Sequence, residues 1–353
     1  MRFLILVCVA VIFAGFGCRD NALEYINSTK PVKRDFVWSI DSVYYGSLPG
    51  KIELESIWGT SATNLWGVAG DASDVRDCLW HYDGVRWSRA TAGTPITEYT
   101  GNKIVYAIWG SANNDIWAFG RKINYDVLSA FIMHYDGTSW TDVTPSNVSS
   151  LKSTLYTVYG ISNNNIWVGG YEYALHYDGQ NWKEYKVADS LIVWSITGTQ
   201  LTTHFLLSSP WNNDTTYIYQ FNDGIFNLKD FTNSYRKKFG YKIWAQGNRL
   251  YSLTNGVIST IMSDQGTIDT ATWQREFSTP TSFREKYPQN TNNIFIVGVW
   301  NLIYHYNGVD WKQIFITIPN YEVDSHSDFW GVWADGKEVF ICDWENGIVY
   351  HGR

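Results

Sequence analysis

Aromatic and acidic side chains gather in six irregular segments, which are the first candidates for binding chemistry. The candidate ligand-binding residues are Tyr125, Tyr171, Glu172, Tyr173, Trp211, Trp300, Asp343, Trp344 and Glu345. Aromatic rings stack on the C–H faces of sugars, and carboxylates accept hydrogen bonds from sugar hydroxyls. These residue types therefore favour a carbohydrate ligand. The alternative is that a chain with so many aromatic residues places rings in most loops by chance and packs them on the rim.

Five histidines recur at one position of a repeated motif that reads HYDG in its best copies. They are His81, His134, His176, His305 and His351. Metal ligands must converge on one ion, whereas one position in five repeats lies at five separate places. We therefore predict a structural role for these histidines, a turn-forming role for Asp83, Asp136 and Asp178, and no metal or cofactor.

The segment Asp324-Ser325-His326-Ser327-Asp328 alternates carboxylate and imidazole and could hold a divalent ion or perform acid–base catalysis. We favour a solvated acidic loop. The sequence contains no nucleophile elbow, phosphate loop, zinc-ligand helix or dinucleotide fingerprint. No catalytic residue is assigned, although an enzyme is not excluded, because catalytic groups can come from separate parts of a chain and leave no linear motif.

The elements that must position these residues are set by an internal repeat, clearest in residues 155–182. Its halves read IWG-x-S-x-x-N-x-IW and HYDG-x-x-W in the best copies. Each half alternates apolar and aromatic residues around a turn of Asn, Asp and Gly, which is typical of a β-hairpin. One repeat is therefore four antiparallel strands. Such units cannot bury both faces alone, so we expect them to stack radially as a β-propeller.

Seven first-strand aromatic residues, about 46 positions apart, indicate seven blades. They are Trp58, Trp109, Tyr159, Trp194, Trp244, Tyr287 and Trp333. The fold class is all-β, a seven-bladed propeller of four-stranded antiparallel blades, with six blades as the alternative if one weak repeat is an insertion. The last repeat lacks a fourth strand, and residues 35–43 are predicted to supply it and cover the open edge.

The repeat also predicts where function lies. In a propeller, the loops between strands one and two and between strands three and four share one face, and here these are the regular turns. The irregular segments fall in the loops between strands two and three, on the opposite face. Since loops vary while the scaffold stays fixed, this face is the predicted binding face.

The N-terminus predicts export. A short apolar run follows Met1-Arg2 and ends in small residues, as in a signal peptide over residues 1–17. The segment before Cys18 resembles the bacterial lipobox, which implies lipidation of Cys18, although Gly15 and Phe16 depart from the usual motif. A plain cleaved signal peptide is the alternative. We expect residues 18–34 to form a lipid-anchored tether and residues 35–353 the propeller.

Composition limits the partners. Aromatic and charged residues each make up 17% of the chain and the net charge is -7, which argues against a nucleic-acid partner. Beyond Cys18, Cys78 and Cys342 fall in the first and last repeats. We favour two unpaired core thiols over a disulfide.

The Trp-Gly-Ser…Asn-Asp-Ile-Trp and His-Tyr-Asp-Gly…Trp pattern resembles the repeat propeller lipoproteins of Bacteroidetes and related bacteria. More distantly, it is similar to the two-component regulator propeller repeat of periplasmic sensors. The resemblance covers most of residues 50–353. It implies a propeller in the cell envelope of a Gram-negative bacterium, as an outer-membrane lipoprotein that faces the periplasm or the surface.

The expected function is that of a monomeric binding or interaction module at the envelope, held on the membrane only through its lipid anchor, with a carbohydrate or an envelope protein as partner. One alternative is a propeller glycoside hydrolase or polysaccharide lyase. The other is a protein–protein scaffold or envelope assembly accessory.

Overall fold

The computed structural model describes residues 31–42, 53–69, 78–90, 102–124, 127–198, 202–210, 215–232, 242–246, 249–254, 257–264, 267–268, 274–278, 283–290 and 292–353. The regular secondary structure of these residues is β-strand apart from one short helix, α2 (Ser146–Ser149). None of their helices is long and apolar enough to cross a membrane.

The strands form seven antiparallel sheets, numbered 1 to 7 along the chain. Sheet 1 contains β2 (Leu54–Ser61), β3 (Asn64–Ala69), β4 (Leu79–Tyr82) and β5 (Trp87–Arg89). Sheet 2 contains β6 (Asn102–Ala112), β7 (Asp115–Asn124), β8 (Val127–Tyr135) and β9 (Trp140–Asp142). Sheet 3 contains β10 (Leu155–Ser162), β11 (Asn165–Gly170), β12 (Tyr173–Tyr177) and β13 (Trp182–Lys186). Sheet 4 contains β14 (Ile192–Gly198), β15 (Thr203–Ser208), β16 (Thr216–Asn222) and β17 (Ile225–Thr232).

Sheet 5 contains β18 (Lys242–Gln246), β19 (Arg249–Thr254), β20 (Val257–Asp264), β21 (Thr267–Ile268) and β22 (Gln274–Ser278). Sheet 6 contains β23 (Phe283–Asn290), β24 (Asn293–Gly298), β25 (Leu302–Tyr306) and β26 (Trp311–Gln313). Sheet 7 contains β27 (Phe329–Ala334), β28 (Val339–Asp343), β29 (Ile348–Gly352) and β1 (Trp38–Ser42). The predicted all-β fold of four-stranded antiparallel units is confirmed, with a fifth strand in sheet 5.

The repeated Asp-Gly pairs form the turns between third and fourth strands, as predicted. Asp83 Oδ1 accepts hydrogen bonds from the backbone N–H groups of Val85 and Arg86, both at 2.9 Å. Asp136 and Asp178 bind their own turns in the same way. The following glycine takes a positive φ, for example 93° at Gly84, which a side chain would disfavour. These aspartates are turn formers.

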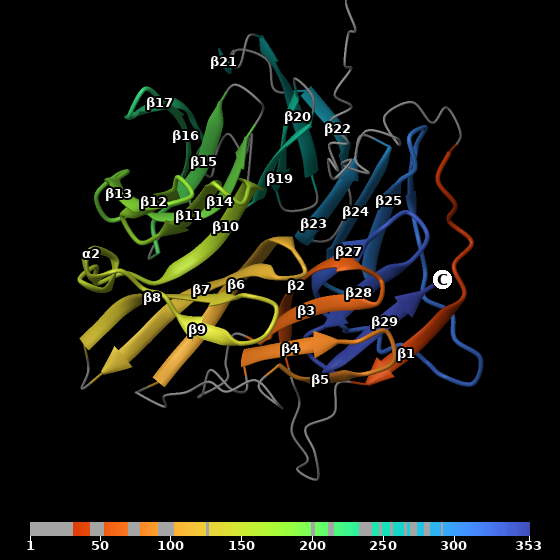
Figure 1. The fold of residues 1–353 in the computed structure, drawn as a ribbon. Coiled ribbons are helices and arrows are strands. Elements are labelled where there is room, and N and C mark those ends of the chain that lie inside the picture. The colour runs from red at the N-terminus through yellow and green to blue at the C-terminus, as the bar shows by residue number, and fades with distance from the viewer. Residues whose placement is uncertain are drawn as a thin grey trace, which may run out of the picture.

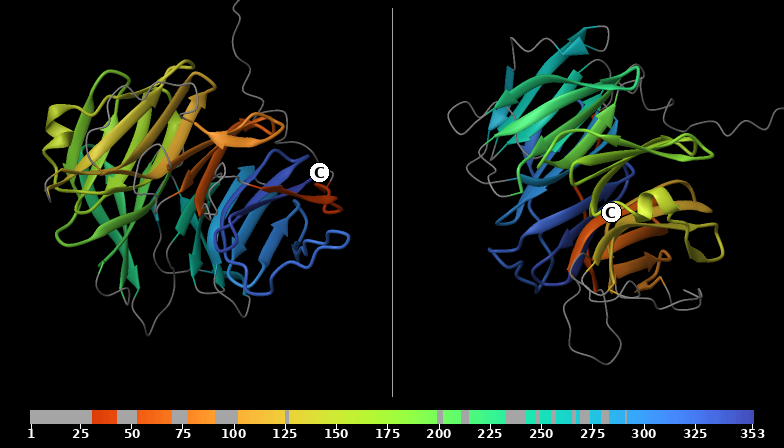
Figure 2. Two further views of the ribbon diagram at one scale, coloured as in Figure 1. Left: turned by 90° about the horizontal axis from the view of Figure 1, so that it is seen from below. Right: turned by 90° about the vertical axis from the view of Figure 1, so that its left-hand side faces the viewer.

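Neighbouring sheets pack through aromatic rings. Trp66 of sheet 1 contacts Tyr135 and Trp140 of sheet 2, with ring centroids 5.0 and 5.4 Å away. The same contact recurs between sheets 7 and 1, where Phe340 lies 5.4 Å from Tyr82. The first strands of successive sheets contact one another from β2 through β6, β10, β14, β18 and β23 to β27, and β27 also contacts β2. Figures 1 and 2 show the sheets following one another around a common centre.

The N-terminal segment lies against the C-terminal strand, as Figure 1 shows for β1 beside β29. The predicted pairing of this segment with the last repeat is present, from Trp38 opposite Gly352 to Ser42 opposite Ile348. Contact begins earlier in the chain than residue 35. Arg34 Nη1 lies 2.6 Å from Asp310 Oδ1 of sheet 6 and Val32 N donates to Asn307 O at 3.0 Å.

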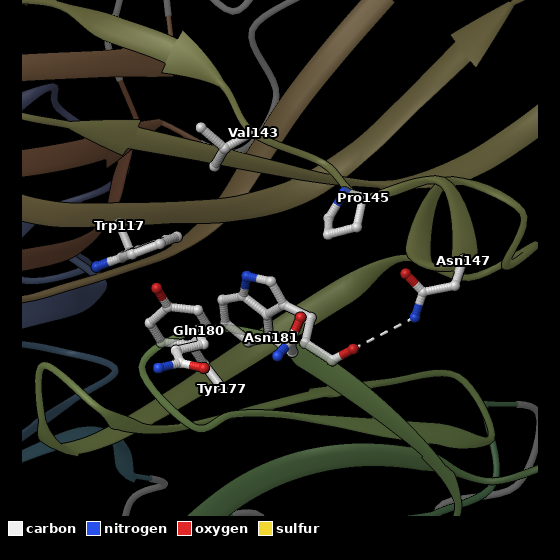
Figure 3. A pocket seen from close by; sticks show the side chains of 8 residues that line it. Trp117, Val143, Pro145, Asn147, Tyr177, Gln180 and Asn181 are labelled. Carbon is white, nitrogen blue, oxygen red and sulfur yellow. Dashed lines mark hydrogen bonds between the residues drawn. The ribbon is translucent and has the colours of Figure 1, made fainter.

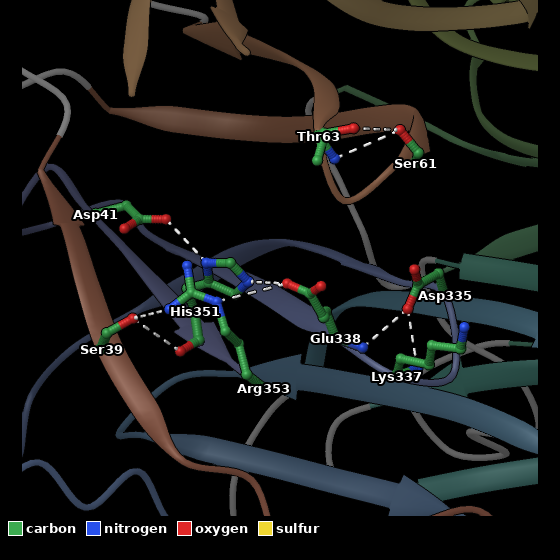
Figure 4. Close-up of polar contacts among 9 residues, drawn as sticks. All are labelled: Ser39, Asp41, Ser61, Thr63, Asp335, Lys337, Glu338, His351 and Arg353. Carbon is green, nitrogen blue, oxygen red and sulfur yellow. Dashed lines mark hydrogen bonds and ion pairs between the residues drawn. The ribbon is translucent and has the colours of Figure 1, made fainter. Parts of the chain in front are cut away.

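The repeated histidines lie in five different sheets and join strands within them. His81 Nε2 is 2.7 Å from Asn64 Oδ1, and His134, His176 and His305 make equivalent bonds to Asp115, Asn165 and Asn293. His351 differs because it lies between two carboxylates (Figure 4). Its Nδ1 is 3.1 Å from Asp41 Oδ2 of β1 and its Nε2 is 2.6 Å from Glu338 Oε2. The structural role predicted for these histidines is confirmed. Cys78 and Cys342 are buried and no disulfide joins them, also as predicted; Cys78 Sγ instead donates to Lys103 O at 3.8 Å.

Candidate binding site

A β-bulge near the start of the first strand recurs in the described part of six sheets. In β6, Val105 pairs with Gly120 and Ala107 pairs with Phe119, so Tyr106 is the extra residue. The extra residues in β2, β6, β10, β14, β23 and β27 are Glu55, Tyr106, Tyr156, Trp194, Arg284 and Trp330. A bulge redirects the side chain of its extra residue and is common next to functional sites.

Three of these bulge residues form an aromatic strip across successive sheets. The ring centroids of Tyr106 and Tyr156 are 5.4 Å apart, and those of Tyr156 and Trp194 are 5.2 Å apart. The three side chains are only partly buried. Trp194 is held by a 2.9 Å hydrogen bond from its Nε1 to Ser208 Oγ at the end of β15. The guanidinium of Arg121, on β7, lies 5.6 Å from the ring centroid of Tyr106.

The strip lies at the face that carries the crossovers between sheets and the loops between second and third strands, which we call the crossover face. First strands begin and second strands end at this face because they run antiparallel. Of the predicted ligand-binding residues that the structure describes, Asp343 is the last residue of β28, Tyr173 is the first residue of β12, and the others lie in these loops. Cys18, Tyr125 and Trp211 lie outside the described residues.

The loops of sheets 6 and 7 come together at the crossover face. Trp344 packs on Trp330 with ring centroids 5.5 Å apart and an interplanar angle of 31°. The backbone N–H of Trp344 donates to Asp328 O at 2.9 Å, and that of Asn301 donates to Ser327 O at 3.0 Å. The crossover before β27 therefore ties Trp344 to the loop that carries Trp300, which is 65% exposed. Glu345 beside them is also exposed.

Asp343 is buried, with 1% of its surface exposed. Its Oδ1 accepts a hydrogen bond from Asn346 N at 3.2 Å, and its Oδ2 accepts one from Asn346 Nδ2 at 3.0 Å. This burial is at odds with the ligand contact predicted for Asp343, because both carboxylate oxygens serve the turn that follows. Asp343 instead shapes the loop that presents Trp344.

In sheet 3, the predicted group Tyr171, Glu172 and Tyr173 is held to the crossovers before and after the sheet. Glu172 has a φ of 64°, and its Oε1 accepts a hydrogen bond from Ser190 N at 2.8 Å. Tyr171 N donates to Ser153 Oγ at 2.9 Å. The three side chains are partly buried, so they form an ordered part of the crossover face. They lie in a different sheet from Trp300 and Trp344.

In the acidic loop before β27, residues 324–326 are exposed, whereas Ser327 is buried. His326 N donates to Asp324 Oδ1 at 2.9 Å, and the side chains of Asp324 and His326 are exposed. Within the described ranges, no three His, Cys, Asp or Glu side chains are grouped so that they could hold a metal ion. Residues 324–326 therefore form a solvated turn.

Sequence reasoning missed Tyr106, Tyr156 and Trp330 and misplaced Trp194. The repeat alignment places Trp194 at the position of Trp58 and Trp109 in the first strand, but the register puts Thr197, which pairs with His204, at that position of sheet 4. The missed residues lie three positions before Trp109, Tyr159 and Trp333. This spacing is a signal in the sequence, but a bulge cannot be recognised without the strand register.

Comparison with known proteins identifies the fold. No family model and no curated protein matches the chain. Among solved structures, "YCF48 bound to D1 peptide" is 15% identical, with 92% of this chain and 98% of that chain covered and a TM-score of 0.61. The WD40 β-propeller domain of Doa1 is 15% identical, with 89% and 97% covered and a TM-score of 0.56. The extracellular domain of a putative one-component system from B. thetaiotaomicron is 14% identical, with 89% and 40% covered and a TM-score of 0.58. The chain has a β-propeller fold.

Proposed function

We propose that the protein is a closed seven-bladed β-propeller that is exported, anchored to the outer membrane through lipidated Cys18, and binds a carbohydrate at its crossover face. The seven sheets, the contact of β27 with β2 and the pairing of β1 with β29 support the closed ring. The apolar N-terminal run before Cys18 supports export. The extracellular domain from B. thetaiotaomicron has the same fold, in keeping with an envelope role.

The aromatic strip carries the carbohydrate assignment. Tyr106, Tyr156 and Trp194 present partly exposed rings side by side, a surface on which consecutive sugar rings can stack. Trp344 and Trp300 add rings on sheets 7 and 6 of the same face, and the exposed carboxylate of Glu345 can accept hydrogen bonds from hydroxyls. We do not propose catalysis, because Asp343 and Glu172 are engaged in local hydrogen bonds.

A protein or peptide partner is the second candidate, favoured by the outer strand of sheet 4. Ile225, Leu228 and Phe231 of β17 are exposed apolar residues on an edge strand. An edge strand offers unpaired backbone groups to an incoming strand. The YCF48 neighbour was solved bound to a peptide, which shows that this fold can hold one.

A glycan array probed with the purified protein tests the proposal. We expect binding to a defined glycan class and a loss of affinity of about 10-fold or more with Tyr156→Ala and with Trp344→Ala. Phe231→Ala, which removes an exposed ring from β17, is the matched control and should leave glycan binding unchanged. If no glycan binds, or if all three variants behave alike, the carbohydrate assignment is wrong.

A further inference from the structure

A cavity of about 400 Å³ lies at the outer strands of sheets 2 and 3, apart from the aromatic strip. Three aromatic residues line it: Trp117 of β7, Tyr177 of β12 and Trp182 of β13. Their ring centroids are 5.0 to 5.7 Å apart. Figure 3 shows Val143 and Pro145 on one side of the cavity and Tyr177 with the Gln180–Asn181 turn on the other.

The polar part of the lining consists of three carboxamides, from Asn147, Gln180 and Asn181, all on exposed residues. A carboxamide both donates and accepts hydrogen bonds, as does a sugar hydroxyl. The turn does not depend on the side chains of Gln180 and Asn181, because their backbone N–H groups bind Asp178 Oδ1 at 2.9 and 2.7 Å. None of the lining residues is Asp, Glu, Lys, Arg or His, so a charged ligand would find no counterion in the cavity.

The crossover beside the cavity, rather than its rings, distinguishes this contact from the one between sheets 3 and 4. Where sheets 3 and 4 meet, Trp167 packs on Phe221 and Phe226 just as Trp117 packs on Tyr177 and Trp182, but the crossover over residues 187–191 contains no helix. Between sheets 2 and 3, the crossover instead forms α2 behind Pro145. Asn147 Nδ2 donates to Trp182 O at 3.3 Å and so fixes the helix against β13 (Figure 3).

We propose that this cavity is a second binding site, which takes an uncharged sugar residue of a neutral glycan. The partly exposed ring of Tyr177, backed by the largely buried Trp117 and Trp182, offers apolar surface to the C–H face of a sugar ring, and the amide rim offers partners to its hydroxyls. The site is independent of the ligand at the crossover face. Two separated sites on one rigid ring would raise the avidity for a polymeric glycan without any new contact.

Calorimetric titration of the full-length protein with neutral hexasaccharides of glucose, mannose and xylose tests the second site. The titrated protein carries Tyr156→Ala and Trp344→Ala, which weaken binding at the crossover face so that the second site dominates the titration. In this background, we expect Gln180→Ala with Asn181→Ala to raise the Kd at least about 10-fold for the hexasaccharide that binds. Val143→Trp, which fills the cavity from its rim, should abolish binding.

The turn of sheet 2 supplies a matched control. Thr138 and Ser139 occupy the positions of Gln180 and Asn181, and their backbone N–H groups bind Asp136 Oδ1 at 2.8 Å. Thr138→Ala with Ser139→Ala should change the Kd less than about 2-fold.

The proposal is overturned if no hexasaccharide binds, if the two paired variants have equal effects, or if a decaproline peptide binds this cavity in place of the sugars. Failure of the crossover-face assignment would look different. In that case, Tyr156→Ala with Trp344→Ala would leave both affinity and stoichiometry at the wild-type values.

Discussion

Trp38 of β1 lies directly opposite Gly352 of β29, in the register that Trp140 shares with Tyr135 and Trp182 with Tyr177. The N-terminal segment thus supplies both the strand and the fourth-strand tryptophan that the last repeat lacks. Gly352 has no ring, and a Cβ added there would come within 3.1 Å of Phe36 Cβ. The two ends of the chain together build one standard sheet.

Trp38→Ala should destabilise the protein by about 3 to 5 kcal/mol, because it empties a buried position between β1 and sheet 6. Urea unfolding followed by circular dichroism measures this. Val37→Ala is the control, since Val37 is 76% exposed and its removal should cost less than about 0.5 kcal/mol. Equal stabilities for the two variants would mean that the packing of β1 through Trp38 does not stabilise the protein.

His351 links β1 to β28 through two carboxylates (Figure 4), and its side chain is only 2% exposed. Glu338→Gln and Asp41→Asn should each cost about 1 to 3 kcal/mol in the free energy of unfolding, because each weakens a charge-assisted hydrogen bond to a buried ring. Glu322→Gln removes an exposed carboxylate and should have no effect. If the protein carrying both Glu338→Gln and Asp41→Asn is as stable to urea as the wild type, the two carboxylates do not stabilise the contact of β1 through His351.

Two buried histidines predict sensitivity to acid. Burial lowers the pKa of His305 to about 3 and that of His204 to about 4, from 6.5, with a smaller contribution from Arg34 and Lys229 respectively. Below pH 6.5, His204 and His305 become protonated in the unfolded chain but stay neutral in the folded protein. Stability is therefore fully present at neutral pH and falls by about 1.4 kcal/mol per pH unit for each histidine as the pH drops toward the folded pKa.

His204→Phe isolates one of these contributions. Neither ring nitrogen of His204 has a hydrogen-bond partner among the described residues, so an apolar ring should fit without loss at pH 7. We expect this variant to lose about 2 kcal/mol less than the wild type between pH 7 and pH 5. His326→Phe, at an exposed position, should leave the loss unchanged. Identical pH profiles for wild type and His204→Phe would refute the assignment.

Asp343 should act on binding only through the loop that it shapes. Asp343→Ala leaves Asn346 without its carboxylate partner and should cost about 1 to 3 kcal/mol in stability. Asp343→Ala should lower glycan affinity less than Trp344→Ala does. The conservative variant Asp343→Asn should retain most of the wild-type affinity. Glu345→Ala, at an exposed residue of the same loop, should leave stability within about 0.5 kcal/mol.

The repeat pattern was enough to predict the four-stranded units, the turns at Asp83, Asp136 and Asp178, and the use of the N-terminal segment in the last sheet. These features depend on local alternation and on turn residues, which are visible in a sequence. The bulges were not visible, since an extra residue is defined only by the pairing of two strands. The repeat alignment therefore places Trp194 three positions away from its place in the strand register. The burial of Asp343 was missed for a similar reason, because its partner Asn346 gives no sign of which way the loop folds.

Hydroxyl-radical footprinting with the glycan selected on the array tests the central claim most directly. The account predicts that saturating glycan slows oxidation of Tyr156, Trp194 and Trp344 together, while Val85 and Val309, exposed at the turns of the opposite face, react as before. Unchanged oxidation of all three rings, or protection confined to those turns, would contradict it.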